Sequence, residues 1–78
     1  ISNGEYEVIE AEIIETSELI NKEIKNANLP DEIRIGAVLR DKKVIIPRSD
    51  FIFQKDDSVV FIAKNDSISI VESLFRLS

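Results

Sequence analysis

The chain has 78 residues, and its 10 basic and 15 acidic side chains give a formal net charge of −5. It contains no Cys, His, Met or Trp, which excludes zinc-finger, haem and iron–sulfur ligand sets, thiol nucleophiles and imidazole bases. Because 44% of the residues are apolar, the chain is too hydrophobic for a disordered segment. The sequence therefore predicts one small globular domain without a metal or disulfide.

The first predicted element is a β-strand over residues 6–14. Ile9 and Ile13 belong to an apolar set with a period of two, which gives the strand one apolar face. Residues 19–27 predict a turn followed by one or two turns of helix. This helix is expected to end before Pro30, because proline disfavours helical backbone in the residue that precedes it.

The middle of the chain predicts a β-hairpin. Residues 33–40 and 43–46 are its two strands, and residues 41–42 form the tight turn between them. Pro47 ends the second strand because it has no backbone N–H to donate. Residues 51–53 then form a short apolar bridge to the next element.

The last third predicts a strand and a helix. Residues 59–63 are apolar at every position, which is typical of a strand covered on both faces. Asp66 is predicted to cap a helix over residues 67–77, whose apolar stripe includes Ile68 and Val71. The element order is β-α-β-β-β-α. This order predicts a single α+β domain with a four-stranded, mainly antiparallel sheet and helices packed on it.

Charge is unevenly distributed along the chain. All acidic residues in the first 18 positions are Glu, with no Lys or Arg among them, and most basic residues fall between positions 22 and 48. The acidic strand and the basic middle are expected to pair within the fold or across a dimer, and Arg34, Arg40 and Arg48 are a candidate local patch that faces the Glu-rich strand of a partner. The alternative is two solvated faces. A domain of this size without disulfides or metals is also expected to be stabilised by a second copy.

A series of short motifs occurs in a recognisable order. The motifs are VIEAEI (8–13), SELINK (17–22), IRIGAVLR (33–40), VIIPRSD (44–50) and QKDD (54–57). Together they resemble the TrkA-C domain, also called the RCK C-terminal domain, of potassium-transport regulators. The resemblance identifies residues 7–78 as this domain and residues 1–6 as a flanking segment.

Three turn positions depart from the family pattern. Asn21, Ser49 and Asp56 stand where this family usually has Gly. Asn and Asp tolerate left-handed backbone better than other residues, so Asn21 and Asp56 are mild replacements, whereas Ser49 is less easily accommodated.

The resemblance implies a regulatory domain of a potassium transport system and not an enzyme. Such domains form homodimers and follow a nucleotide-binding domain in cytoplasmic proteins, which are peripheral to the inner membrane through the potassium channel or transporter that they gate. NAD or ATP is then expected only on that separate domain. Neither nucleic-acid binding nor direct membrane insertion is expected. The alternative is a ligand-free structural dimerisation domain attached to another membrane transporter.

In some members of this family, the cleft between two copies binds a small ligand, notably cyclic di-AMP. Carried over by position, the candidate residues of this dimer cleft are Ile9, Ile20, Asn21, Ile33 and Pro47. The apolar side chains would form walls for a base, and Asn21 would supply hydrogen bonds. The alternative is that Ile9 and Ile33 are core or dimer-seam residues. Two phosphates also require Lys or Arg, and the segment around Asn21 offers lysines but no arginine.

Other chemistry has weaker support in the sequence. Glu10 and Glu12 share one face of the predicted strand, but nothing nearby forces either to be buried, as a catalytic carboxyl requires. Asp56, Asp57 and Asp66 lack the spacing of a calcium loop, and turn and cap roles account for them. The net charge of −5 disfavours nucleic-acid binding. The longest clean apolar run is far shorter than the roughly 20 residues that span a bilayer.

Overall fold

The computed structural model describes residues 5–76, with all side chains except those of residues 75 and 76. Its strands are β1 (Tyr6–Glu12), β2 (Ile33–Arg40), β3 (Lys43–Ile45) and β4 (Ser58–Lys64). Its helical segments are the 3₁₀ turns η1 (Ile24–Asn26) and η2 (Asn65–Ser67) and the α-helix α1 (Ile68–Arg76). Residues 1–4 of the expected flanking segment and residue 77 of the expected last helix lie outside the described residues.

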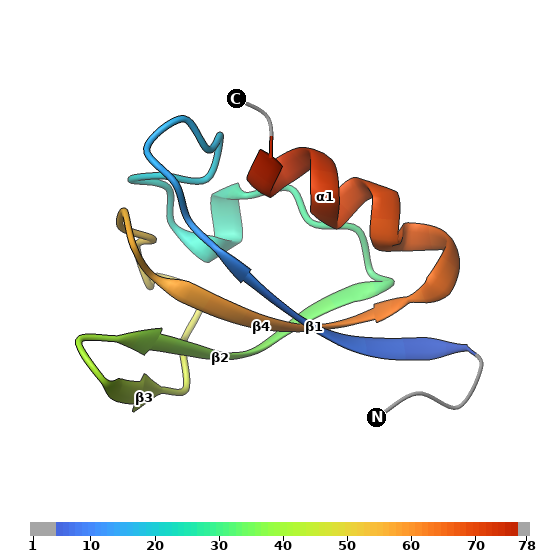
Figure 1. Ribbon diagram of the computed structural model, residues 1–78, viewed down its shortest axis with the longest axis horizontal. Helices are drawn as coiled ribbons and strands as arrows, with labels where there is room; N and C mark the ends of the chain where they lie inside the picture. Colours follow the sequence, from blue (N-terminus) through green and yellow to red (C-terminus); the bar gives the residue numbers. More distant parts are fainter. Residues whose placement is uncertain (1–4, 77–78) are drawn as a thin grey trace.

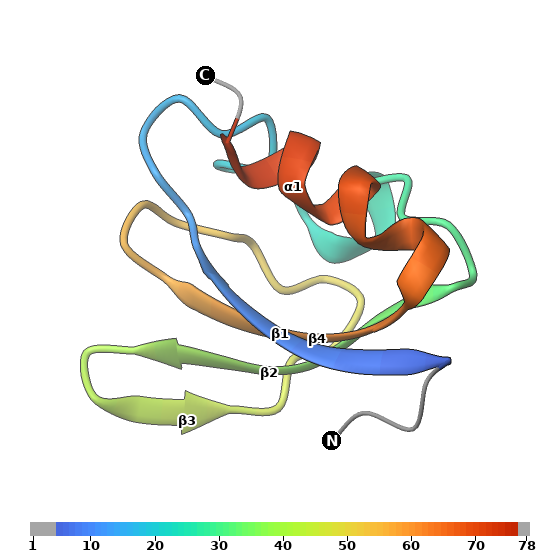
Figure 2. The same cartoon turned by 45° about the vertical axis from the view of Figure 1, so that its right-hand side comes forward.

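The strands form one sheet in the order β1-β4-β2-β3, and every neighbouring pair is antiparallel. Helix α1 crosses one face of this sheet, and the loop that contains η1 lies on the same side (Figures 1 and 2). This arrangement confirms the predicted α+β class and the four-stranded antiparallel sheet. It places β1 at one edge of the sheet and the short β3 at the other.

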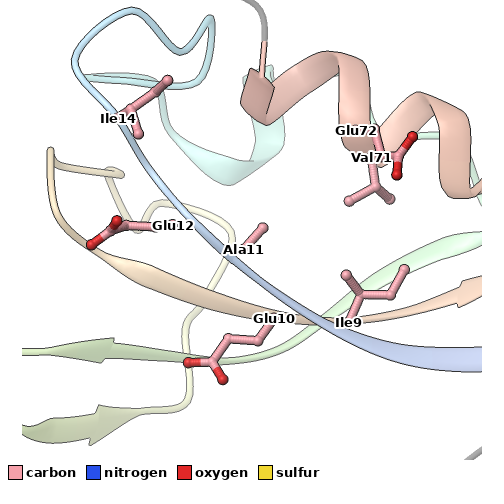
Figure 3. Close-up of a pocket in the computed structure, with 7 residues that line it drawn as sticks. All are labelled: Ile9, Glu10, Ala11, Glu12, Ile14, Val71 and Glu72. Atoms are coloured by element: carbon pink, nitrogen blue, oxygen red, sulfur yellow. The ribbon is translucent and has the colours of Figure 1, made fainter.

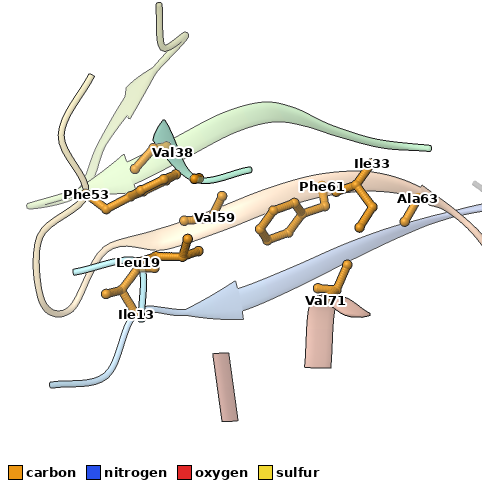
Figure 4. Packing of buried hydrophobic residues seen from close by; sticks show 10 residues of the cluster. Ile13, Leu19, Ile33, Val38, Phe53, Val59, Phe61, Ala63 and Val71 are labelled. Carbon is orange, nitrogen blue, oxygen red and sulfur yellow. The ribbon is translucent and has the colours of Figure 1, made fainter. Parts of the chain in front are cut away.

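The hydrophobic core fills the space between the sheet and the segments that cover it. Ile9, Phe61 and Ile35 stand opposite one another across β1, β4 and β2, so their side chains share the covered face. Phe61 and Phe53 are fully buried there (Figure 4). The central position of β4 explains why its inward side chains form the middle of the core.

The opposite face of the sheet is open, which corrects the expectation for residues 59–63. Val59, Phe61 and Ala63 are fully buried, but Val60 is only half-buried and Ile62 is 44% exposed. The prediction of a strand covered on both faces is therefore wrong for the isolated chain. The physical reason is that α1 and the loops lie on one side of the sheet only (Figure 2).

The helix expected within residues 19–27 is reduced to the single 3₁₀ turn η1. Asn21 has a φ of 64°, which no α-helix permits, and its N–H donates to the Phe53 carbonyl over 2.8 Å. The Ile24 N–H donates to the Phe51 carbonyl over 3.0 Å. Because this segment uses its N–H groups to pair with a neighbouring loop, they are not available for a regular α-helix.

The turn positions follow the local chemistry of their residues. Asp41 and Lys42 have φ values of 53° and 66°, which identify the predicted two-residue hairpin turn between β2 and β3. Asn21 and Asp56 also have positive φ, at 64° and 75°, so the expectation that they replace Gly in left-handed backbone is confirmed. Ser49 is not among the positive-φ residues and needs no special accommodation there.

The N-cap assigned to Asp66 is wrong. The helical turns begin earlier, with η2, whose N-cap is Lys64, and no side chain caps it. Asp66 lies within the first turn of η2. A carboxylate in this position still interacts favourably with the free N–H groups at a helix start.

A partly buried ion pair joins the end of β2 to the loop before β4. The Arg40 Nε and Nη2 atoms donate to the two carboxylate oxygens of Asp57, each over 2.7 Å. Asp57 is 1% exposed and also accepts from the Gln54 N–H over 2.8 Å. Arg40 Nη2 further donates to the Ile52 carbonyl over 3.0 Å, and its guanidinium lies 4.7 Å from the centre of the Phe51 ring. The hydrogen bond to Asp57 raises the pKa of Arg40 above its ordinary value.

Asp57 also holds the end of β1. The Ile13 N–H donates to the Asp57 carbonyl over 2.8 Å, and the Asp56 N–H donates to the Ile13 carbonyl over 2.8 Å. The turn role predicted for Asp57 is confirmed, but its partner Arg40 was not predicted. This cluster of contacts, which we call the Arg40–Asp57 clamp, connects the ends of β1 and β2 to the loop before β4.

Candidate functional site

A hollow on the surface lies between edge strand β1 and helix α1. Its volume is about 550 Å³. Ile9 and Ala11 point from β1 toward Val71 of α1, whereas Glu10 leaves the strand on the opposite side (Figure 3). We call this hollow the acidic groove, and its lining residues are Ile9, Glu10, Ala11, Glu12, Ile14, Val71 and Glu72.

The acidic groove does not have the features of a catalytic carboxylate pair. Glu10 and Glu12 are exposed and face the same side of β1, opposite Val60 and Ser58 of β4. A carboxyl that acts as a general acid near neutral pH requires a buried or strongly charged environment. The expectation that these residues form a solvated strand face is therefore confirmed.

Another hollow lies toward the other edge of the sheet, along β2. Strand β3 pairs only with residues 38–40, so among the described residues the first half of β2 has no strand on that side. A hollow of about 270 Å³ lies there. We call it the basic pocket, and its lining residues are Ile24, Leu29, Ile33, Arg34, Ile35, Pro47, Arg48 and Ser49.

The residues predicted for the dimer cleft are divided between these places. Ile9 is half-buried in the acidic groove, whereas Ile33 and Pro47 line the basic pocket. Ile20 packs against the core, and Asn21 is exposed. Strand β4 separates β1 from β2, so within one chain these residues do not meet in a single pocket. A site that uses all of them requires a second copy.

The core interpretation of Ile33 is confirmed, because this residue is only 3% exposed and belongs to the buried cluster. Its neighbour Arg34 is exposed and lines the basic pocket together with Arg48. The predicted arginine patch thus contains Arg34 and Arg48, but Arg40 is engaged by Asp57 instead. Sequence reasoning missed the two arginines as site residues, although each directly follows a candidate residue in the chain.

Within the described residues, the four-stranded antiparallel sheet and the one α-helix across it define a small α+β domain. The TrkA-C domain model matches residues 8–76. The chain belongs to this family, the TrkA-C or RCK C-terminal domains. Among the described residues, no helix combines the length and apolar character that crossing a membrane requires.

Relatives of known description agree with this assignment. The chain is 42% identical over 76 residues to the Trk system potassium uptake protein TrkA of Azorhizobium caulinodans, a match that covers 97% of the chain and 17% of that protein. It is 33% identical over 64 residues to a TrkA homolog of Archaeoglobus fulgidus, with 82% of the chain and 15% of that protein covered. The chain thus spans about a sixth of the length of these relatives.

Solved structures share the fold. The RCK_C domain dimer of S. agalactiae BusR in complex with c-di-AMP superposes with a TM-score of 0.77 at 23% identity, covering 91% of this chain and 97% of that one. The RCK C domain of the potassium transport protein KtrA, in complex with c-di-AMP, gives a TM-score of 0.75 at 20% identity, covering 87% and 81%. At these identities the likeness shows the fold.

Proposed function

We propose that the chain is a dimerising, ligand-sensing regulatory domain of a potassium transport system. The observation that carries the proposal is the family match over residues 8–76, together with relatives described as Trk system potassium uptake proteins. The domain acts through conformational change and not through catalysis. It works in the cytoplasm, at the inner membrane, where the parent protein contacts a potassium channel or transporter. Any NAD or ATP binds a separate domain of that parent.

Dimerisation is supported by the surfaces that one chain leaves uncovered. Val8 and Ile62 are exposed side by side on the open face of the sheet, and Val44 and Ile46 are exposed near its β3 edge. Strand β1 is an edge strand, which is an available surface for pairing. One structural neighbour is described as a domain dimer. A second copy that covers these apolar side chains would therefore add hydrophobic stabilisation, which a core of this size needs.

The proposed ligand is a cyclic dinucleotide such as cyclic di-AMP, held between two copies. Both structural neighbours are described as complexes with c-di-AMP. Ile9 and Ile20 would supply apolar walls and Asn21 a side-chain amide, while Ile33 and Pro47 would contribute from the hollow along β2. Such a ligand shifts the balance between two arrangements of the dimer only by its difference in affinity for them. That shift is the signal passed to the transporter.

Calorimetric titration of the chain with cyclic di-AMP tests this proposal. The Asn21→Gly variant removes the side-chain amide and keeps the left-handed backbone, so we expect it to bind several-fold more weakly. Asn28→Gly is the matched control, because Asn28 is also exposed with a positive φ of 56°. Absence of binding heat for the unmodified chain would overturn the ligand proposal.

A second candidate function is a ligand-free structural dimerisation domain attached to another membrane transporter. The observation that favours it is the charge of the acidic groove, since Glu10, Glu12 and Glu72 would repel phosphates near Ile9. A dimer that gives no heat with cyclic di-AMP would support this alternative.

A further inference from the structure

We propose that edge strand β1 is a docking strand for a partner protein, which adds to the sheet an extended segment of alternating basic and apolar residues. The acidic groove beside β1 receives the apolar side chains of this segment, and the carboxylates of Glu10 and Glu12 receive the basic ones. The proposal goes beyond the dimer cleft, because it concerns a polypeptide partner and needs neither a second copy nor a cyclic dinucleotide.

The backbone of β1 offers hydrogen bonds on the side that faces away from β4. The Ile13 N–H donates to the Asp57 carbonyl over 2.8 Å, and the Asn65 N–H donates to the Glu5 carbonyl over 2.9 Å. Ladder bonds alternate along each strand of an antiparallel pair, and the register of β1 with β4 is unbroken. The odd-numbered residues of β1 therefore bond to β4. The residues whose N–H and C=O groups point toward the free edge are Val8, Glu10 and Glu12.

The covered face of β1 has room for the side chains of an added strand. Ile9 and Ala11 are only half-buried, and they point toward Val71 across the acidic groove, whose volume is about 550 Å³ (Figure 3). Residues directly opposite each other in two paired strands place their side chains on the same face. Apolar side chains of the partner that stand opposite Ile9 and Ala11 therefore enter the acidic groove and are buried against Val71.

The opposite face of β1 selects basic side chains. Glu10 and Glu12 are exposed on this face, and among the described side chains, those of residues 5–74, neither forms an ion pair. The first 18 positions of the chain contain no Lys or Arg, so this segment brings no competing cation of its own. Opposite charges directly across two strands stabilise their pairing. Lys or Arg opposite Glu10 and Glu12 thus completes the alternation of the partner segment.

The same charges disfavour a second copy as the occupant of this edge. A continuous sheet made by two antiparallel β1 strands places Glu10 and Glu12 of the two copies opposite or diagonal to one another on one face. Like charges in such positions destabilise strand pairing. The free edge of β1 therefore suits a cationic segment of another protein better than a second β1.

Hydrogen exchange measured by nuclear magnetic resonance tests the proposal. The probe is a synthetic peptide of alternating lysine and valine that matches the 7 residues of β1. In the unbound chain, the amides of Val8, Glu10 and Glu12 should exchange faster than those of Ile9 and Ala11. The peptide should slow exchange several-fold at the first three amides, because they become donors to the added strand. A peptide with its lysines and valines in separate blocks is the control and should bind more weakly.

The carboxylates are tested by the Glu10→Gln/Glu12→Gln variant. Its affinity for the alternating peptide should fall about fivefold at low salt, because two cross-strand ion pairs are lost. Glu15→Gln/Glu18→Gln changes the net charge by the same amount at exposed positions outside the groove. We expect this control to bind the peptide as the unmodified chain does.

The backbone contribution is tested by comparing Glu10→Pro with Glu10→Gln. Both variants remove one charge, but only proline removes an N–H that points toward the free edge. Proline is tolerated at such a position of an edge strand, and circular dichroism verifies that the variant is folded. The proline variant should bind the peptide more weakly than the glutamine variant. Equal binding of these two variants would contradict strand addition.

Three further results would overturn the proposal. They are an unchanged exchange rate at Val8, Glu10 and Glu12 with the peptide, equal binding of the two peptides, and protection of these amides by a higher chain concentration alone. The last result would identify a second copy as the occupant.

The outcome is independent of the dimer cleft. A chain that binds cyclic di-AMP but not the alternating peptide contradicts this inference alone. A chain that binds the peptide along β1 but gives no heat with cyclic di-AMP supports this inference and contradicts the ligand proposal.

Discussion

Two hollows of this domain, the acidic groove and the basic pocket, both have apolar walls, but their rims carry opposite charges. The acidic groove lies between β1 and α1 and carries Glu10, Glu12 and Glu72, whereas the basic pocket lies along β2 and carries Arg34 and Arg48. Apolar walls alone therefore do not distinguish the possible occupants. The rims do, because the groove complements a cationic surface and the pocket complements an anionic ligand.

The difference arises from strand order. The acidic segment of the sequence forms β1 at one edge, the basic middle forms β2 and β3 toward the other, and β4 lies between them. An uneven distribution of charge along the chain thus becomes an uneven distribution in space. That the acidic side of one copy contacts the basic side of another across a dimer stays a prediction.

The largest expected effect comes from removing the Arg40–Asp57 clamp, whose two charged residues line neither hollow. Asp57→Ala leaves the Arg40 guanidinium without its partner and also releases the Gln54 N–H. Breaking a buried ion pair costs roughly 3–5 kcal/mol, and we expect about 3 kcal/mol because Arg40 retains some solvent contact. Urea denaturation measures this loss.

Asp56→Asn is the control for the Asp57 variant. Asp56 is exposed, its ion pair with Lys55 is long at 3.4 Å, and Asn tolerates its φ of 75°. We expect an unchanged free energy of unfolding. Equal stability of the Asp57 and Asp56 variants would show that the Arg40–Asp57 clamp does not hold the fold.

A smaller loss of stability is expected from a change that loosens helix α1, which forms one wall of the acidic groove. The Ser17 hydroxyl donates to the Leu74 carbonyl over 3.0 Å and accepts from the Leu19 N–H over 3.1 Å, so it fastens α1 to the loop after β1. Ser17→Ala removes both bonds and should cost about 1–2 kcal/mol. Hydrogen exchange should increase in α1 while the amides of the basic pocket keep their protection.

Ser73→Ala serves as the comparison for Ser17→Ala. The Ser73 hydroxyl bonds only to the Ile70 carbonyl of its own helix and is exposed. Because Ala is the better helix former, this change should be neutral or slightly stabilising. Increased exchange at both hollows in Ser17→Ala would contradict the independence of the two regions.

The smallest effect tests the charge of the groove. Glu10→Gln/Glu12→Gln should leave stability unchanged, because both side chains are exposed. It should raise the affinity for cyclic di-AMP a few-fold at low salt and less at physiological salt, since screening weakens the repulsion. Glu15→Gln/Glu18→Gln, at exposed positions outside the groove, is the control. Equal affinities of the two variants for cyclic di-AMP would show that the charges of Glu10 and Glu12 do not influence binding.

Much of this fold could be predicted from local patterns. The period of two in β1, the left-handed turn at Asp41 and Lys42 and the apolar run of β4 each depend on neighbouring residues. The turn and helix predicted over residues 19–27 are reduced to the 3₁₀ turn η1, because N–H groups of this segment pair with a loop much later in the chain, as in the bond from Asn21 to Phe53. Sequence order alone does not reveal such a partner.

The candidate site was less predictable than the fold. Arg34 and Arg48 come together only because β3 stops short and leaves half of the β2 edge free. Arg40 has the same side chain and a similar place in the sequence, but it is half-buried and paired with Asp57. Only the tertiary structure distinguishes the arginine that holds the fold from the two that are free for a ligand.

The most direct test of the central claim, a ligand-sensing dimer, is sedimentation velocity of the chain at tens of micromolar with and without cyclic di-AMP. The account predicts a species with the mass of two chains that becomes more compact or more populated when the ligand is present. A species with the mass of one chain under both conditions would contradict it.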